Sequence, residues 1–130
     1  MSKDLHPSIL DFFHSRMDDH GNVDRLEDIT TEEFYLFTIR RARQRDSLTV
    51  WLSDAYIFGD MDFFNRPQEL QRGDFILVAK PEGGFQVHDE LIADAHIGVG
   101  KIGKFMGALN HRNPWEYLTH EERERREGRR

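Results

Sequence analysis

One uninterrupted apolar run constrains the fold of this chain more than any other feature. Residues 75–79 read Phe-Ile-Leu-Val-Ala between Asp74 and Lys80, and this density of β-branched and aromatic residues predicts a buried strand. The run is far too short to cross a bilayer, so no contact with a membrane is expected. A turn sequence, Pro-Glu-Gly-Gly, occupies residues 81–84, and residues 85–87 read as a returning strand, which together predict a hairpin.

Apolar residues at helical spacing alternate with these strand signals. Helices are predicted over residues 7–17, 30–45, 88–97 and 101–110 and from residue 119 onward, and further strand signals lie in residues 48–52 and 55–59. The helix from residue 30 is expected because Thr30 precedes Glu33 by three residues, as in a capping box. Gly98 and Gly100 indicate a corner between two helices. The expected class is α+β, with a short antiparallel sheet packed by two or three helices and a charged C-terminal helix.

The length of 130 residues fits one domain, expected over residues 1–118, followed by a charged helix or tail at 119–130. The chain contains no cysteine, which rules out disulfides, thiolate zinc sites and cysteine nucleophiles. The N-terminus has no long apolar segment and therefore no secretory signal, so we expect an intracellular protein.

Charge is distributed unevenly along the chain. The formal net charge is −6, which weakens any broad electrostatic attraction to nucleic acid. Acidic residues nevertheless dominate before Phe34, whereas positive charge gathers at Arg40, Arg41, Lys101 and Lys104 and in the C-terminal tail. Two interpretations stay open, a basic binding face on an acidic protein and solvated helix ends.

No complete catalytic motif is present. The acidic and histidine residues that suggest an enzyme are Asp60, Asp62, Glu90 and His96, which would serve a metal-assisted hydrolase if they converged. The spacing does not favour a shared ion, because His88 and His96 are more than two helical turns apart and no His-Glu-x-x-His motif occurs. The sequence therefore predicts no catalytic residue, no metal ligand and no cofactor.

Two aromatic pairs lie beside turn signals. Phe63 and Phe64 precede the turn signal at residues 65–67, Asn-Arg-Pro, and Trp115 and Tyr117 follow the Asn-Pro pair at residues 113–114. Exposed aromatic side chains beside turns are typical anchors for a partner protein. We expect these four residues to be exposed and to bind such a partner.

Residues 88–109 carry a resemblance to a known family. They read His-Asp-Glu-Leu-Ile-Ala-Asp-Ala-His-Ile-Gly-Val-Gly-Lys-Ile-Gly-Lys-Phe-Met-Gly-Ala-Leu. This segment resembles the start of the zinc-binding N-terminal domain of retroelement integrases of the gypsy and related types, a His-His-Cys-Cys-type domain. His96 lies where the first zinc histidine of the family would be, Lys101 takes the place of the second, and the cysteine pair is missing.

The resemblance implies a zinc-free, transposon-derived remnant of an integrase domain that is kept for binding, with His96 in a structural role. It also implies a nuclear or chromatin setting and contact with DNA through Lys101, Lys104, Arg40 and Arg41. From the residues and the resemblance together we expect a non-catalytic adaptor domain that binds a protein partner. The alternatives are the metal-assisted hydrolase and a nucleic-acid-binding module.

Overall fold

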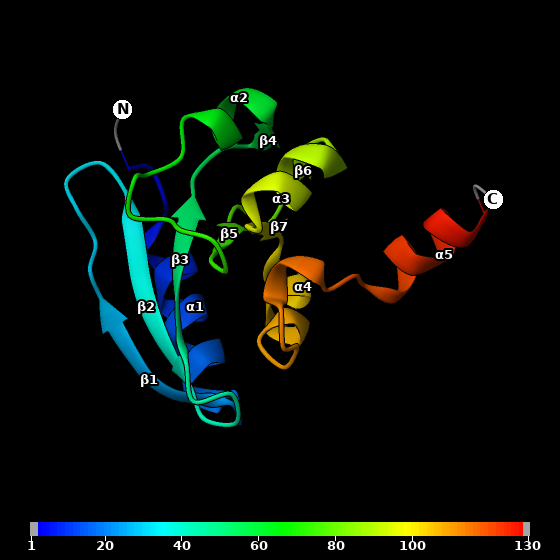
Figure 1. Cartoon of the computed structure of the whole chain (residues 1–130). Helices are drawn as coiled ribbons and strands as arrows, with labels where there is room; N and C mark the ends of the chain where they lie inside the picture. The colour runs from blue at the N-terminus through cyan, green and yellow to red at the C-terminus, as the bar shows by residue number, and fades with distance from the viewer. Residues whose placement is uncertain (1–2, 129–130) are drawn as a thin grey trace.

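A computed structural model describes residues 3–128 of the chain. Its elements, in chain order, are α1 (Pro7–Asp19), β1 (Val23–Asp28), β2 (Tyr35–Arg41), β3 (Ser47–Ser53), β4 (Ile57–Gly59), α2 (Asp60–Phe64), β5 (Phe75–Val78), β6 (Gly84–Gln86), α3 (Asp89–Ala95), β7 (Gly98–Gly100), α4 (Ile102–Ala108), the 3₁₀ helix η1 (Pro114–Glu116) and α5 (His120–Gly128). Figure 1 shows their arrangement, with α5 on one side of the molecule. The helices expected near residues 7–17, 88–97, 101–110 and 119 onward are confirmed.

A five-stranded mixed sheet in the order β1-β2-β3-β5-β7 forms the centre of the fold. The first three strands are antiparallel, whereas β3, β5 and β7 are parallel to one another. The α+β class is therefore confirmed, although the sheet is mixed rather than wholly antiparallel. The strands β4 and β6 form a separate two-stranded parallel sheet.

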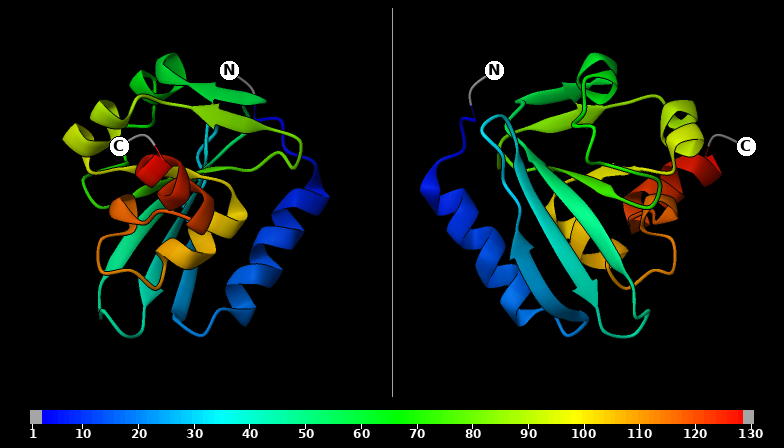
Figure 2. Two further views of the ribbon diagram at one scale, coloured as in Figure 1. Left: turned by 90° about the vertical axis from the view of Figure 1, so that its right-hand side faces the viewer. Right: turned by 60° about the vertical axis from the view of Figure 1, so that its left-hand side comes forward.

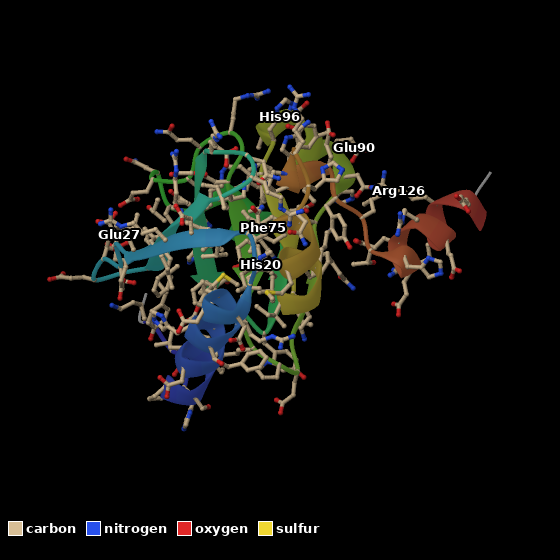
Figure 3. All side chains as sticks on the ribbon, turned by 90° about the horizontal axis from the view of Figure 1, so that it is seen from below. His20, Glu27, Phe75, Glu90, His96 and Arg126 are labelled. Carbon is tan, nitrogen blue, oxygen red and sulfur yellow. The ribbon has the colours of Figure 1, made fainter. Side chains whose placement is uncertain are left out.

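Both faces of the main sheet are covered. On one face α1 and α4 pack against side chains such as Phe37 and Phe75 (Figure 3). On the other face the small sheet, α2 and α3 pack against a row that runs across four strands, namely Leu36, Trp51, Ile76 and Val99. Figure 2 shows α1 alongside the strands and the small sheet across one end of them.

The predicted helix over residues 30–45 is wrong, because residues 35–41 form the strand β2. The Thr30 hydroxyl, expected to cap a helix, donates to the backbone carbonyl of Leu36 and accepts from its N–H. The Thr31 hydroxyl accepts hydrogen bonds from the backbone N–H groups of Glu33 and Phe34, so the two threonines close a turn instead of starting a helix. Leu36 packs on one face of the sheet, and Phe37 and Ile39 pack on the other. A strand buried on both faces does not show the alternation of apolar and polar residues that identifies a half-exposed strand, so the sequence pattern of residues 35–41 does not distinguish it from a helix.

The predicted hairpin between residues 75–80 and 85–87 is also wrong. The strand β5 lies between β3 and β7, and β6 pairs with β4, because the backbone N–H of Gly84 donates to the carbonyl of Tyr56. The expected glycine corner at residues 98–100 is instead the edge strand β7. A Cβ atom on Gly98 would lie 2.5 Å from the Phe75 ring, so the close packing of β7 requires this glycine.

No helix within residues 3–128 has the length and apolar character needed to cross a membrane.

Candidate interaction surface

An exposed apolar patch lies on β4 and α2. Six large hydrophobic side chains of the described residues are exposed, and four of them fall within residues 56–64. These four, here called the β4–α2 patch, are Tyr56, Ile57, Met61 and Phe64, each more than half exposed at 57%, 52%, 69% and 59%. Met61 and Phe64 are three residues apart and share one side of α2. Clustered exposure of this kind makes the patch a candidate binding surface, whereas single exposed apolar residues are ordinary.

Buried neighbours hold the β4–α2 patch in place. Ile57 is followed by Phe58, which is fully buried and meets Trp51 edge-on with ring centroids 5.5 Å apart. In α2 the side chain of Phe63 is buried in the same cluster as Phe58. The exposed side chains therefore sit on elements whose inner faces are anchored in the core, so little ordering is needed before they bind.

Two aspartates fix the start of α2. The Asp62 carboxylate accepts a hydrogen bond of 2.9 Å from the backbone N–H of Gly59. The Asp60 carboxylate accepts one hydrogen bond from the backbone N–H of His88 at 3.0 Å and pairs with the imidazole of the same residue. The backbone hydrogen bond from His88 is the largest cause that lowers the pKa of Asp60, and the hydrogen bond to Asp60 raises the pKa of His88. The pair ties the first residue of α2 to the residue that precedes α3.

The charged residues within residues 53–65 are all acidic, although the next residue, Arg66, holds its guanidinium 4.6 Å from the ring centroid of Phe63 in α2. Between Ser53 and Asn65 the charged residues are Asp54, Asp60 and Asp62, with no lysine or arginine among them. Asp54 accepts a hydrogen bond from the backbone N–H of Asp4, so it too has a structural role. The patch therefore presents apolar side chains within an acidic segment.

The four aromatic residues expected to be exposed do not behave alike. Phe64 is exposed, whereas the expectation that Phe63 is exposed is wrong, since this side chain is 2% exposed. Trp115 is half-buried and stacks on the His96 ring at 4.0 Å between centroids. Tyr117 is half-buried against the core and fills the space beside Gly107. Trp115 and Tyr117 therefore hold η1 against its neighbours, while Phe64 faces solvent.

The basic residues proposed for DNA contact are dispersed. Arg41 is buried and pairs with Asp46, whereas Arg40, next to it on β2, is exposed. Lys104 pairs with Glu122 of α5 at 3.0 Å. Lys101 donates hydrogen bonds to the carbonyl groups of residues 81 and 83. Three of the four side chains thus have specific partners within the fold, and they do not share one exposed face.

The residues of the hydrolase alternative are engaged separately. Asp60 and Asp62 hold the start of α2, as described above, and Glu90 and His96 lie at the two ends of α3 (Figure 3). His96 adopts a left-handed backbone conformation with φ 54° and accepts a hydrogen bond from the Arg72 guanidinium at its ring. Within residues 3–128 no three histidine, aspartate and glutamate side chains lie close enough together to hold a metal ion.

Most of the β4–α2 patch is not predicted from the sequence. The strand signal over residues 55–59 does not indicate which face of the strand carries Tyr56 and Ile57, and no motif includes Met61. The available signal was the helical spacing of Met61 and Phe64, which places Phe63 on the opposite side of the same helix. Reading that spacing would have separated the buried phenylalanine from the exposed one.

Searches of protein-family models, curated proteins and solved structures give no match to this chain. The resemblance of residues 88–109 to integrase N-terminal domains therefore stays a prediction. In the structure the two positions compared with zinc histidines, His96 and Lys101, are separated by the strand β7.

Proposed function

We propose that this chain is a non-catalytic interaction domain that binds a partner protein through the β4–α2 patch. The observation that carries the proposal is the clustering of four exposed large hydrophobic side chains within residues 56–64, on β4, on α2 and on the residue before β4. Phe58 and Phe63 anchor the same two elements in the core. Apolar and aromatic side chains held in this way supply most of the binding free energy at protein interfaces.

The surroundings of the patch define the chemistry of the partner. Because residues 54–62 carry three aspartates and Arg66 is the one basic residue that follows closely, we expect the matching surface to have an apolar centre and a rim with more lysine and arginine than acidic residues. Complementary rim charge accelerates encounter and selects the orientation of docking. A partner with an acidic rim would be repelled, so we expect selectivity as well as affinity.

The two alternative functions receive less support from the geometry. A hydrolase that uses Asp60 and Asp62 would have to break the hydrogen bonds that begin α2. A nucleic-acid-binding module would need basic side chains gathered on one exposed face, whereas Arg41 is buried. If the integrase resemblance reflects ancestry, we expect the partner to be a chromatin protein in the nucleus. Without that ancestry, we propose only that the protein acts inside the cell.

Site-specific photo-crosslinking tests the proposal in cells of the source organism. A benzophenone amino acid is placed at Met61, and in a matched control at Phe12, which is also more than half exposed but lies on α1. We expect one partner to be captured from position 61 and not from position 12. The captured protein is then purified, and its affinity is measured by titration calorimetry against the full chain.

The affinity measurements decide the outcome. Phe64→Asp should weaken binding of the purified partner by about 30-fold or more, which corresponds to a central interface residue. Phe12→Asp should leave the affinity within about threefold, since a rim or unrelated surface residue contributes little. Wild-type affinity in both Met61→Asp and Phe64→Asp would contradict the proposal, and so would dimerisation of the chain alone through these residues.

A further inference from the structure

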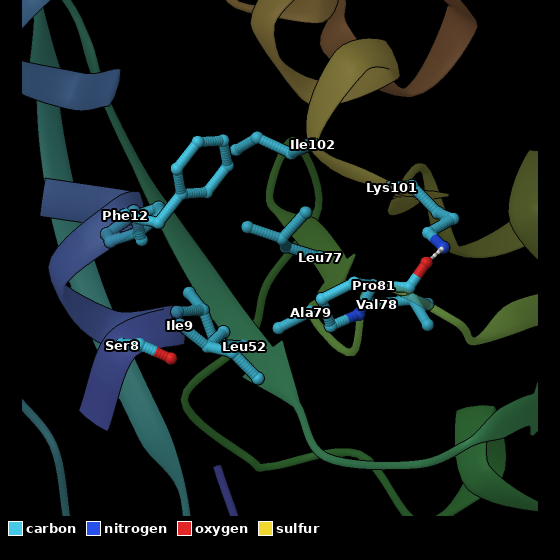
Figure 4. A pocket seen from close by; sticks show the side chains of 11 residues that line it. Ser8, Ile9, Phe12, Leu52, Leu77, Val78, Ala79, Pro81, Lys101 and Ile102 are labelled. Atoms are coloured by element: carbon cyan, nitrogen blue, oxygen red, sulfur yellow. Dashed lines mark hydrogen bonds between the residues drawn. The ribbon is translucent and has the colours of Figure 1, made fainter. Parts of the chain in front are cut away.

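A cavity of about 500 Å³ lies on the other face of the main sheet, away from the β4–α2 patch. It is bounded by α1 and by residues between β5 and the start of α4 (Figure 4). Of its eleven lining residues, nine have no polar side-chain group, and the exceptions are Ser8 and Lys101. The volume lies within the range of roughly 300–1,000 Å³ that is typical of small-molecule sites.

The apolar lining comes from α1, β3, β5, the loop after β5 and the first residue of α4. Leu52 of β3 and Leu77 of β5 are buried and form the floor, and Ile9 of α1 is partly buried beside them. Phe12, also on α1, lines the cavity with 51% of its surface exposed. An apolar molecule in the cavity would cover this aromatic ring and remove its exposed surface from water.

Lys101 supplies the one charge of the lining. Its ammonium donates hydrogen bonds to the backbone carbonyls of Pro81 and Gly83, the latter at 2.6 Å, which leaves one of its three N–H groups without a protein acceptor. No carboxylate within residues 3–128 forms an ion pair with it, although Glu82 lies between the two carbonyl-bearing residues and is exposed. Two neutral carbonyls orient the ammonium but do not neutralise its charge.

We infer that this cavity binds a small amphiphile with one carboxylate head and an unbranched apolar tail, that is, a medium-chain fatty acid. The carboxylate accepts the remaining N–H of Lys101, at the side of the cavity away from α1 (Figure 4). The tail lies over Leu77 and reaches the wall formed by Ile9 and Phe12. Lys101 is the one cation of the lining, and the hydroxyl of Ser8, the other polar group, is already hydrogen-bonded to the His6 ring. The lining therefore matches a ligand with one anionic end and an apolar remainder.

Titration calorimetry with decanoate, below its critical micelle concentration, tests the inference on the full chain. We expect saturable binding with one site per chain, and binding of decanol at least tenfold weaker. Lys101→Met should weaken decanoate binding at least tenfold and bring it level with decanol. Ala79→Phe, which fills part of the cavity from its lining, should weaken both ligands at least tenfold.

Two controls keep the result specific. Lys80→Met removes the same charge from the next lysine, which pairs with Asp4 and does not line the cavity, and should leave the affinity within threefold. Phe64→Asp should have no effect, because the β4–α2 patch is a separate surface. Absence of saturable decanoate binding, equal affinity for decanoate and decanol, or unchanged binding in a folded Ala79→Phe protein would each overturn the inference. Folding of each variant is checked by urea denaturation.

Discussion

Replacement of Arg41 by methionine offers the sharpest test of the packing described above. The Arg41 side chain is 2% exposed, and its guanidinium donates two hydrogen bonds of 2.8 Å to Asp46 and one of 2.6 Å to the carbonyl of His111. It therefore joins the end of β2 to the turn after it and to the segment that follows α4. Methionine keeps most of the apolar stem and removes only the charged donors.

The expected loss of free energy of unfolding depends on the environment of the Asp46 carboxylate once Arg41 is replaced. Removing one partner of a fully buried ion pair costs about 3–5 kcal/mol, because the other charge stays buried. Here the side chain of Asp46 is 48% exposed, so water can hydrate the carboxylate once the guanidinium is gone. We therefore expect a decrease of about 2–3 kcal/mol in the free energy of unfolding, the value of one or two hydrogen bonds to a charged group.

Urea denaturation followed by tryptophan fluorescence measures this decrease. With a slope of about 2 kcal/mol per molar urea, the midpoint should fall by about 1 M. Arg40→Met is the matched control, since the neighbouring residue on the same strand is exposed, and its effect should stay within about 0.5 kcal/mol. Equal midpoints for Arg41→Met and Arg40→Met would refute the reasoning. The pKa of Asp46, now lowered chiefly by the hydrogen bond from Arg41, should return toward its ordinary value in Arg41→Met.

Three further predictions concern single contacts. The Asp60–His88 pair stabilises the fold above the ordinary aspartate pKa of about 3.9 and below the ordinary histidine pKa of about 6.5, and its contribution is lost as pH falls through the lowered pKa of Asp60 or rises through the raised pKa of His88. An NMR titration should show the raised His88 midpoint falling in Asp60→Asn, and an unchanged midpoint would contradict this. Asp74→Ala should cost about 3 kcal/mol in urea denaturation, because two partly buried backbone N–H groups lose the buried carboxylate that accepts from them, and Asp74→Asn should cost about half as much; equal losses would argue against this role. Gly98→Ala should cost about 1–3 kcal/mol by crowding an aromatic ring of β5, whereas Gly103→Ala, with open space around it, should be neutral or stabilising in the same assay.

The α+β class and four of the helices were predictable because their signals are local. Residues 7–17 show the pattern most clearly, since Pro7 begins the helix and buried Phe13 and Met17 repeat at helical spacing. The apolar run at residues 75–79 also indicated a strand correctly. In each case the neighbours in the sequence determine the conformation.

Strand pairing was not predictable, because it depends on distant residues. Residues 35–41 have apolar positions that fit a helix as well as a strand buried on both faces, and only the cores on either side of the sheet decide between them. The turn at residues 81–84 favours a hairpin locally. In the structure the backbone N–H of Gly84 donates to the carbonyl of Tyr56, so β6 pairs with β4 in the small sheet, and β5 pairs with β3.

The interaction surface was predictable only in part for a related reason. Phe64 was selected because it stands beside a turn, and Phe63 was selected with it because adjacency in the sequence does not reveal which side of α2 faces the core. Which side of α2 faces the core is determined by Phe58 and by the row of buried side chains across the main sheet, against which Phe63 packs. Lys101 is predicted as a contact for DNA, but its place beside an apolar cavity depends on α1, which lies far away in the chain.

The order of the strands has a consequence for how the β4–α2 patch is displayed. β4 and β6 are neighbours in space, yet the chain between them passes through the main sheet as β5. A synthetic peptide that covers only residues 54–66 would lack β6, the anchoring cluster and the His88 contact, and would have no reason to hold its four apolar side chains in one arrangement. A partner that binds as proposed would therefore recognise only the folded chain, and would distinguish the native protein from its nascent or degraded forms.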